Sequence, residues 1–256
     1  ASPHPGSVHD RPLDARPPPS PTATLASGVI FTSSTTAHLS KASADTCLLR
    51  DGCVAAPAAG QGTVVAGYSS GELIAYRYEN GRSLWADALA RTNISTQVGS
   101  LTDIDADPII YDGRVYALGQ GGRMAAYELL TGQRIWELNL AGISTPAVAG
   151  EWIFTLTDDA RMLAIARSTG KVRWITQMPR YRDQEDKEGA IFWQGPVLAG
   201  NNLWSVNSIG EVWRVSTGEG SASLVARLDD PVSLPPIVAN QTLYVFDDGG
   251  RITAFR

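Results

Sequence analysis

Histidine, cysteine and long apolar runs are scarce in this chain of 256 residues. The histidines are His4, His9 and His38, and the cysteines are Cys47 and Cys53. A His-based catalytic triad or a zinc site is therefore not expected, because each needs several such side chains at fixed spacings. No stretch approaches the roughly 18 consecutive apolar residues that a transmembrane helix requires.

Positive charge is also scarce, and it is dispersed. The chain has 21 Lys and Arg residues against 26 Asp and Glu residues, and its net charge is −5. Nucleic-acid-binding proteins usually carry a basic patch or stripe, so nucleic acid is not an expected partner. The first residues also lack the basic and apolar segments of a signal peptide. That leaves a cytosolic protein or a mature or truncated secreted product.

The dominant feature of the chain is a unit that returns five times in register. Each unit begins at a proline, namely Pro57, Pro108, Pro146, Pro196 or Pro236. The residue 24 positions later is a glycine in the complete units, including Gly81, Gly132 and Gly170. The residue 28 positions later is Trp85, Trp136 or Trp174, with Leu224 in the fourth unit. A repeat of about 40–50 residues with β-type patterning predicts a β-propeller.

One unit shows how the repeat would fold. Residues 115–118 and 124–127 are predicted strands on either side of the glycine-rich turn 119–122. A second turn leads to a third strand at 134–136. The alanine 18 positions after the proline, replaced by Arg214 in the fourth unit, would leave room for a neighbouring sheet, and the tryptophan would pack between sheets as a buried plug. Since no single unit can bury both of its own faces, stability is expected to come from stacking of neighbours.

The repeat also divides the chain into segments. Residues 1–22 contain nearly half of the prolines and are predicted to form an extended or disordered tail. Residues 23–56 are a degenerate copy, and residues 57–107, 108–145 and 146–195 are complete copies. Residues 196–235 are a copy with its Trp replaced, and residues 236–256 are a partial copy. The expected fold class is all-β, a propeller of four-stranded antiparallel blades in an incomplete or truncated ring of about five to six blades. Proline cannot donate to a central ladder, so residues 1–20 are not expected to close the ring.

Two connections between units are long, polar and rich in charge, at residues 91–107 and 180–190. Long loops on a rigid scaffold are common sites of binding. The first contains Asp103 and Asp105, which lie two residues apart and would point to the same face of an extended segment. The segment begins like a calcium-binding loop, but Pro108 and Arg114 stand where an EF-hand needs Gly and Glu. An EF-hand is therefore excluded, and either a solvated strand entrance or a partner contact remains.

The two cysteines flank residues 48–52 and fit neither a CxxC redox motif nor zinc spacing. They could form a small disulfide in an oxidising compartment, or they could be two incidental thiols of the degenerate unit.

Residues 126–136 and 164–174, with their Thr-Gly-x-x-x-Trp segments, resemble the repeat of pyrroloquinoline-quinone-type propellers. A longer stretch is more specific. Residues 101–108, 115–118 and 122–126 resemble the BamB family, whose members are propeller lipoproteins of the machine that inserts β-barrels into the outer membrane. The similarity runs from about Pro57 to the C-terminus.

The BamB resemblance implies an eight-bladed, non-enzymatic propeller on the periplasmic face of the Gram-negative outer membrane. It also implies docking onto a POTRA domain of BamA through two neighbouring loops. Asp103 and Asp105 match the Asp-x-Asp of one loop, at the same distance from the repeat proline. Leu48, Leu49 and Arg50 are the nearest match to the Leu-x-Leu-Arg of the other, two residues further from the proline and without the intervening residue. The family's lipid-bearing N-terminal cysteine has no counterpart here, and the chain is short for eight blades.

The alternative function is that of a fragment of a quinone-dependent dehydrogenase. Such enzymes resemble this chain in their repeat, but they are much longer and commonly place two adjacent cysteines beside the quinone. This chain has no adjacent cysteines. The prediction is therefore a scaffold without cofactor or metal, whose partners are a BamA-like POTRA domain and other subunits of the assembly machine. It would meet the membrane only through a lipid anchor.

Overall fold

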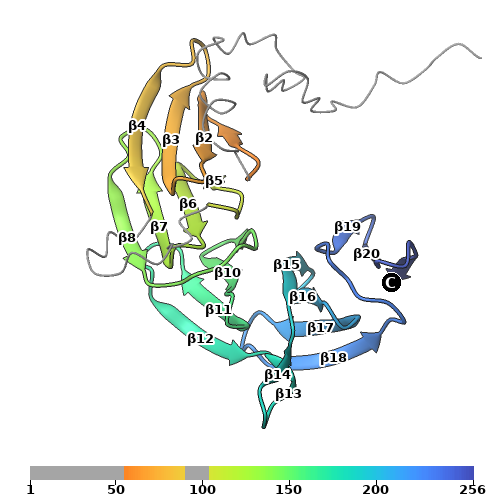
Figure 1. Cartoon of the computed structure of the whole chain (residues 1–256). Coiled ribbons are helices and arrows are strands. Elements are labelled where there is room, and N and C mark those ends of the chain that lie inside the picture. Colours follow the sequence, from red (N-terminus) through yellow and green to blue (C-terminus); the bar gives the residue numbers. More distant parts are fainter. Residues whose placement is uncertain (1–54, 90–103) are drawn as a thin grey trace, which may run out of the picture.

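The structure is a computed structural model that describes residues 55–89 and 104–256, and in these residues it contains β-strands but no helix (Figure 1). The proline-rich tail, most of the degenerate unit with both cysteines, and the segment that contains Asp103 lie outside the described residues. The predictions made for those segments therefore remain predictions.

Four sheets have four antiparallel strands each, in sequence order. The first contains β1 (Ala58–Gly60), β2 (Thr63–Gly67), β3 (Glu72–Arg77) and β4 (Ser83–Ala88). The second contains β5 (Ile109–Tyr111), β6 (Arg114–Gly119), β7 (Arg123–Glu128) and β8 (Arg134–Leu138). The third contains β9 (Ala147–Ala149), β10 (Trp152–Leu156), β11 (Arg161–Ala166) and β12 (Val172–Gln177). The fourth contains β15 (Trp193–Ala199), β16 (Asn202–Asn207), β17 (Glu211–Ser216) and β18 (Ala222–Arg227).

A fifth sheet has three strands, β19 (Ile237–Ala239), β20 (Thr242–Phe246) and β21 (Ile252–Phe255). The sheets follow one another along an open arc, with the first strand of each sheet on the inner side (Figure 1). The predicted class, an all-β propeller of four-stranded antiparallel blades in an incomplete ring, is confirmed.

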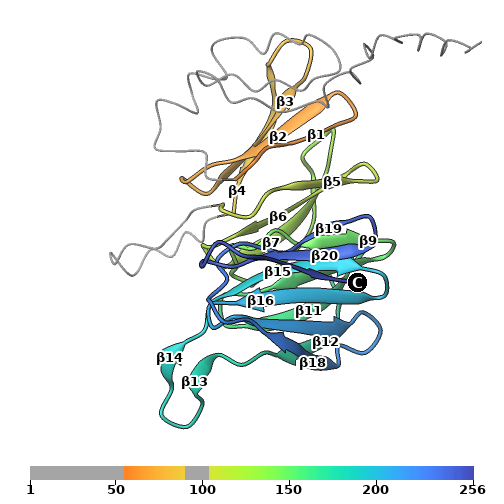
Figure 2. The ribbon, with the colours of Figure 1, turned by 90° about the vertical axis from the view of Figure 1, so that its right-hand side faces the viewer.

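The connection at residues 180–190 is more ordered than a loop. It forms a two-stranded hairpin of β13 (Tyr181–Asp183) and β14 (Glu188–Ala190) between the third and fourth sheets. Its many charged residues hid this pairing from the sequence pattern. In Figure 2 the hairpin projects from the body of the arc.

Adjacent sheets bury alternate side chains against each other. The first and second sheets share one core cluster, in which Val65, Leu73 and Ala75 meet Val115 and Tyr127. The second and third sheets share another, in which Tyr116 and Ala126 meet Ile153 and Leu163. The repeat alanine is fully buried at such a contact in the first three sheets, as its predicted spacing role requires: these residues are Ala75, Ala126 and Ala164. The fourth sheet has Arg214 at this position, and Ala254 of the fifth sheet is exposed.

The repeat tryptophans occupy equivalent positions between neighbouring sheets. Each indole N–H donates to a backbone carbonyl in the outer turn of the next sheet: Trp85 to Leu129 (2.7 Å), Trp136 to Arg167 (2.9 Å) and Trp174 to Thr217 (3.0 Å). The prediction that all three are buried holds for Trp136 and is wrong for the other two. Trp136 is 9% exposed, whereas Trp85 and Trp174 are half-buried, because their sheets cover them less completely.

The repeat glycines lie under these tryptophan rings. A Cβ at Gly170 would lie 2.9 Å from Cδ2 of Trp136, and one at Gly220 would lie 2.6 Å from Cε3 of Trp174. A Cβ at Gly132 would clash with Trp85 in the same way. Gly81, like these three, has a positive φ, so both conformation and close approach favour glycine in this turn.

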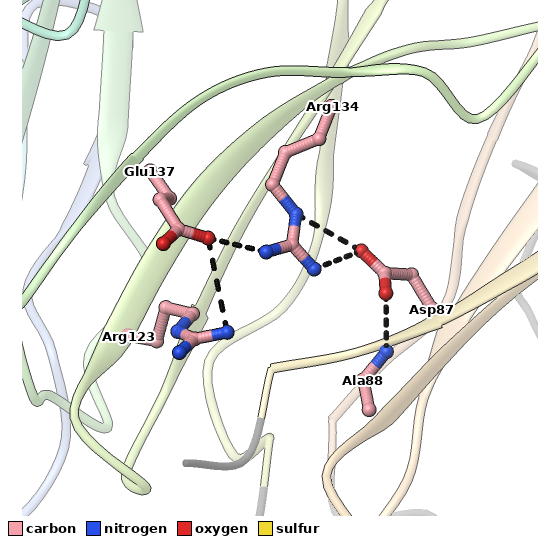
Figure 3. A network of polar contacts seen from close by, with 5 residues as sticks. All are labelled: Asp87, Ala88, Arg123, Arg134 and Glu137. Atoms are coloured by element: carbon pink, nitrogen blue, oxygen red, sulfur yellow. Dashed lines mark hydrogen bonds and ion pairs between the residues drawn. The ribbon is translucent and has the colours of Figure 1, made fainter. Parts of the chain in front are cut away.

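A polar network adds to the contact between the first and second sheets (Figure 3). Arg134 on β8 donates from Nε to Oδ2 of Asp87 on β4 (3.1 Å) and also contacts Glu137, which Arg123 approaches at 3.7 Å. Burial opposes ionisation of Asp87, but the hydrogen bonds from Arg134 prevail and lower the pKa of this carboxyl. The Arg134 guanidinium also lies 5.7 Å from the centre of the Tyr127 ring, which stacks on Trp85.

The fifth sheet leaves one apolar face open. Leu243 and Val245 face the fourth sheet and are buried. On the opposite face Tyr244, Phe246 and Ile252 are 36%, 46% and 67% exposed. The residues at the matching repeat positions of the second sheet, Tyr116, Leu118 and Met124, are fully buried by the third sheet.

Candidate protein-binding site

One end of the blades is acidic. Because the strands of each sheet alternate in direction, the turns between second and third strands and the connections between sheets all lie at this end, which we call the loop end. Its acidic residues in the described segments are Asp105, Asp107, Asp158, Asp159, Asp183, Glu185, Asp186, Glu188, Asp229, Asp230, Asp247 and Asp248. Its basic residues there are Arg180, Arg182, Lys187 and Arg251. The turns of the opposite end are nearly balanced, with Glu79, Asp112, Glu151 and Glu219 against Arg82, Arg167 and Lys171.

Residues 104–108, which lead from the first sheet into β5, are anchored at the loop end by alternate side chains. Ile104 and Ala106 are fully buried, and Asp105 between them is half-buried. The Ile104 N–H donates to the Tyr68 carbonyl (3.3 Å), and its side chain packs so closely on Gly67 that a Cβ there would lie 2.6 Å away. The position of Asp105 is thus fixed by the buried residues on either side.

Asp107 joins its own connection to two others by hydrogen bonds. Its Oδ1 accepts a hydrogen bond from the Ala56 N–H (2.7 Å), before β1, and its own N–H donates to Thr145 Oγ1 (3.1 Å), before β9. The strand entrances of the first three sheets are therefore joined at the loop end. Asp107 supports the connection structurally, a role that its sequence position alone did not reveal.

Asp105 lies close to the β10–β11 turn of the third sheet. Burial raises the pKa of the Asp158 carboxyl in that turn, and the negative charges of Asp159 and Asp105 raise it further. Asp159 is neutralised locally by Arg161, whose Nε lies 2.7 Å from its Oδ2. Asp105, in a connection between sheets, and Asp158, in a turn within the third sheet, thus lie within electrostatic reach of each other. Such a pair favours a cation or several N–H donors on a partner.

The raised pKa of Asp158 leads to a prediction. When the folded state raises the pKa of an acid, the free energy of unfolding falls as pH rises from the ordinary pKa of that acid, here 3.8, through its folded-state pKa. Asp158→Asn removes this penalty, so we expect a slightly higher unfolding temperature at neutral pH and no gain in strong acid. Thermal unfolding followed at several pH values measures this. Glu79→Gln, in an exposed turn at the opposite end, is the control, and an equal response of both variants contradicts the assignment.

The structure places one of the predicted partner-binding residues, Asp105, in this region. Asp103, Leu48, Leu49 and Arg50 lie outside the described residues, so their assignment stays a prediction. Asp158 was not anticipated. Its Asp-Asp pair resembles an ordinary polar turn, and its approach to Asp105 depends on how two successive sheets pack.

Within the described ranges no group of three or more His, Cys, Asp or Glu side chains is arranged to hold a metal ion. In the same ranges no helix is both long and apolar enough to cross a membrane.

The comparisons with known proteins settle the family. The family model described as "Outer membrane protein assembly factor BamB" matches residues 38–176, more than half of the chain. The chain belongs to the BamB family.

Similar curated BamB proteins include those of Yersinia pestis and Escherichia coli K12. The first is 25% identical over 201 residues, covering 78% of this chain and 49% of the relative. The second is 25% identical over 198 residues, covering 77% and 48%. The chain therefore spans about half the length of the curated BamB relatives that it matches.

Solved structures support the fold. BamB from Moraxella catarrhalis superposes with a TM-score of 0.67 at 22% identity, covering 78% of this chain and 57% of that one. A europium-containing methanol dehydrogenase superposes with a TM-score of 0.55 at 14% identity, covering 75% of this chain and 51% of that one. At these identities both similarities indicate a shared propeller architecture.

Proposed function

We propose that this chain acts as a non-enzymatic scaffold of outer-membrane β-barrel assembly, at the periplasmic face of a Gram-negative outer membrane. Its partner would be a POTRA domain of a BamA-like protein, bound through the loop end. The single observation that carries this proposal is the position of Asp105. It is held by buried neighbours beside Asp158, on the acidic end of a BamB-family propeller.

The chemistry of the site favours a basic or amide-rich edge on the partner. Carboxylates that stand close together repel each other, and this repulsion is relieved when a partner supplies positive charge or N–H donors. Asp103, two residues before Asp105, would add a third carboxylate. Leu48, Leu49 and Arg50 would add an apolar and cationic contact on the neighbouring connection, as the family resemblance implies.

The test is the double substitution of Asp103 and Asp105 by alanine. We expect binding to purified POTRA domains to weaken at least about tenfold, since truncating one partner of a buried charged contact typically costs ~2–5 kcal/mol. The thermal stability should change little, because the segment at Asp105 is held by the buried side chains of Ile104 and Ala106, which the substitution leaves in place. Isothermal titration calorimetry and thermal unfolding of the same preparations provide the two measurements.

A matched control replaces Glu79 and Glu219, which lie at the opposite end of the blades, by alanine. This variant removes the same charge but should bind like the wild type. Wild-type binding by the Asp103/Asp105 variant, or no binding by the unmodified chain, would overturn the proposed docking site.

A further inference from the structure

The β13–β14 hairpin creates a second feature of the loop end, two connections away from Asp105. It leaves the third sheet after β12 and returns directly into β15, and it stands clear of the sheets in Figure 2. Arg182 on β13 lays its side-chain stem on Gly189 of β14, where a Cβ would lie 3.1 Å from its Cδ.

Phe192, at the base of this hairpin, is 70% exposed although its backbone is firmly held. Its N–H donates to Ser208 Oγ (3.0 Å), and its carbonyl accepts from the Ser208 N–H (2.9 Å). The residues on both sides, Ile191 and Trp193, are buried, and the Trp193 indole N–H donates to the Pro179 carbonyl (2.8 Å). The alternation of a strand entrance therefore fixes the aromatic ring of Phe192 toward solvent.

An open pocket of about 340 Å³ lies against the same serine. Its lining is Arg182, Ser208, Ile209, Asp229 and Pro231. The loops that form it are joined by backbone hydrogen bonds, from Val232 N–H to the Asn207 carbonyl (3.3 Å) and from Asp248 N–H to the Pro231 carbonyl (2.8 Å). The pocket thus offers apolar surface at Ile209 and Pro231 on a framework that is already assembled.

Negative charge dominates around this pocket. The hairpin carries Asp183, Glu185, Asp186 and Glu188, and the loops beside β18 and β20 carry Asp229, Asp230 and Asp248, whereas Asp247 is fully buried. The cations nearby are Arg180, Arg182, Lys187 and Arg251, and Arg251 is engaged with Asp229 at 2.7 Å. Lys and Arg are therefore the complementary charges for a ligand here.

We propose that Phe192 and this pocket form a second protein-binding site, which takes an extended polypeptide segment with apolar side chains next to lysine or arginine. The apolar side chain of the partner packs on Phe192, Ile209 and Pro231, and its basic neighbours face the surrounding carboxylates. A rigidly presented aromatic residue beside a pocket is a typical interface anchor, since little conformational entropy is lost when it is covered. The site is independent of Asp103 and Asp105.

The experiment uses the full chain and three labelled peptides in fluorescence anisotropy titrations. The probe is Gly-Ser-Leu-Lys-Phe-Lys-Gly-Ser. One control peptide has Glu in place of both Lys residues, and the other has Ser in place of Leu and Phe. We expect the probe to bind at least about tenfold more tightly than either control, because it alone combines apolar and basic side chains.

The protein variants localise the binding. Phe192→Ser should weaken binding of the probe by about tenfold. Leu130→Ser, which removes another exposed apolar side chain at the opposite end, should leave this affinity unchanged. Arg182→Gln should strengthen it, because it removes a repelling cation. Equal binding of the Glu peptide, or an unchanged affinity of Phe192→Ser, overturns the proposal. Replacing Asp103 and Asp105 by alanine should leave probe binding intact, which separates this site from the proposed POTRA contact.

Discussion

Replacing Trp136 by alanine should lower the free energy of unfolding by about 3–5 kcal/mol, the usual cost of truncating a buried tryptophan. The ring is 9% exposed, lies over Gly170 and has its centre 6.1 Å from that of Tyr116. Truncation would leave a cavity between the second and third sheets. It would also remove the indole N–H that donates to the Arg167 carbonyl (2.9 Å).

Urea unfolding followed by circular dichroism measures this effect. The matched control is Ile135→Ala on the same strand, because that side chain is 38% exposed and should cost under about 1 kcal/mol. Trp136→Phe should fall between the two, since it keeps an aromatic ring but loses the hydrogen bond. Similar costs for Trp136→Ala and Ile135→Ala would show that the tryptophan does not hold the two sheets together.

Replacing Glu211 by alanine should lower the free energy of unfolding by about 2–3 kcal/mol, because it leaves buried donors in the fourth sheet without an acceptor. The Glu211 side chain is 8% exposed. Its Oε2 accepts from Trp213 Nε1 (2.9 Å) and Asn207 Nδ2 (3.1 Å), and its Oε1 accepts from Arg227 Nε (3.2 Å). Asn207 is fully buried and cannot turn to water for a replacement partner.

The same carboxyl should make stability depend on pH. Burial opposes its ionisation, but the hydrogen bonds from Trp213, Asn207 and Arg227 prevail and lower its pKa below the ordinary value of 4.5. Its contribution is therefore present above that value and is lost as pH falls through the folded-state pKa. The urea midpoint of the wild type should drop more steeply in acid than that of Glu211→Gln. Parallel pH curves for the two proteins would contradict this.

The register of the repeat predicted the blades because each repeated position has one physical task. The glycine at position 170 and the tryptophan at position 136 belong to adjacent units, and their contact follows once the units are stacked. The degree of burial does not follow from register. Trp85 and Trp174 share the position but not the cover of Trp136, because that cover depends on the side chains around each interface.

The candidate site was only partly predictable for a related reason. The Asp-x-Asp spacing drew attention to Asp105, but Asp158 comes near it only when the third sheet takes its place in the arc. The hairpin at residues 181–190 was missed because its charged residues lack the apolar alternation typical of strands. Its pairing is held by the strand ends and by the Ile191 N–H, which donates to the Arg180 carbonyl (2.9 Å).

The open face of the fifth sheet has a consequence for motion. In an arc of stacked units, opening an inner sheet breaks two interfaces, whereas opening the fifth sheet breaks only its contact with the fourth among the described residues. Its strands should therefore sample locally opened states more often than those of the inner sheets, and local stability should fall from the inner sheets toward the fifth. A covering surface on Tyr244, Phe246 and Ile252 would remove this gradient and make the sheets open and close as one cooperative unit.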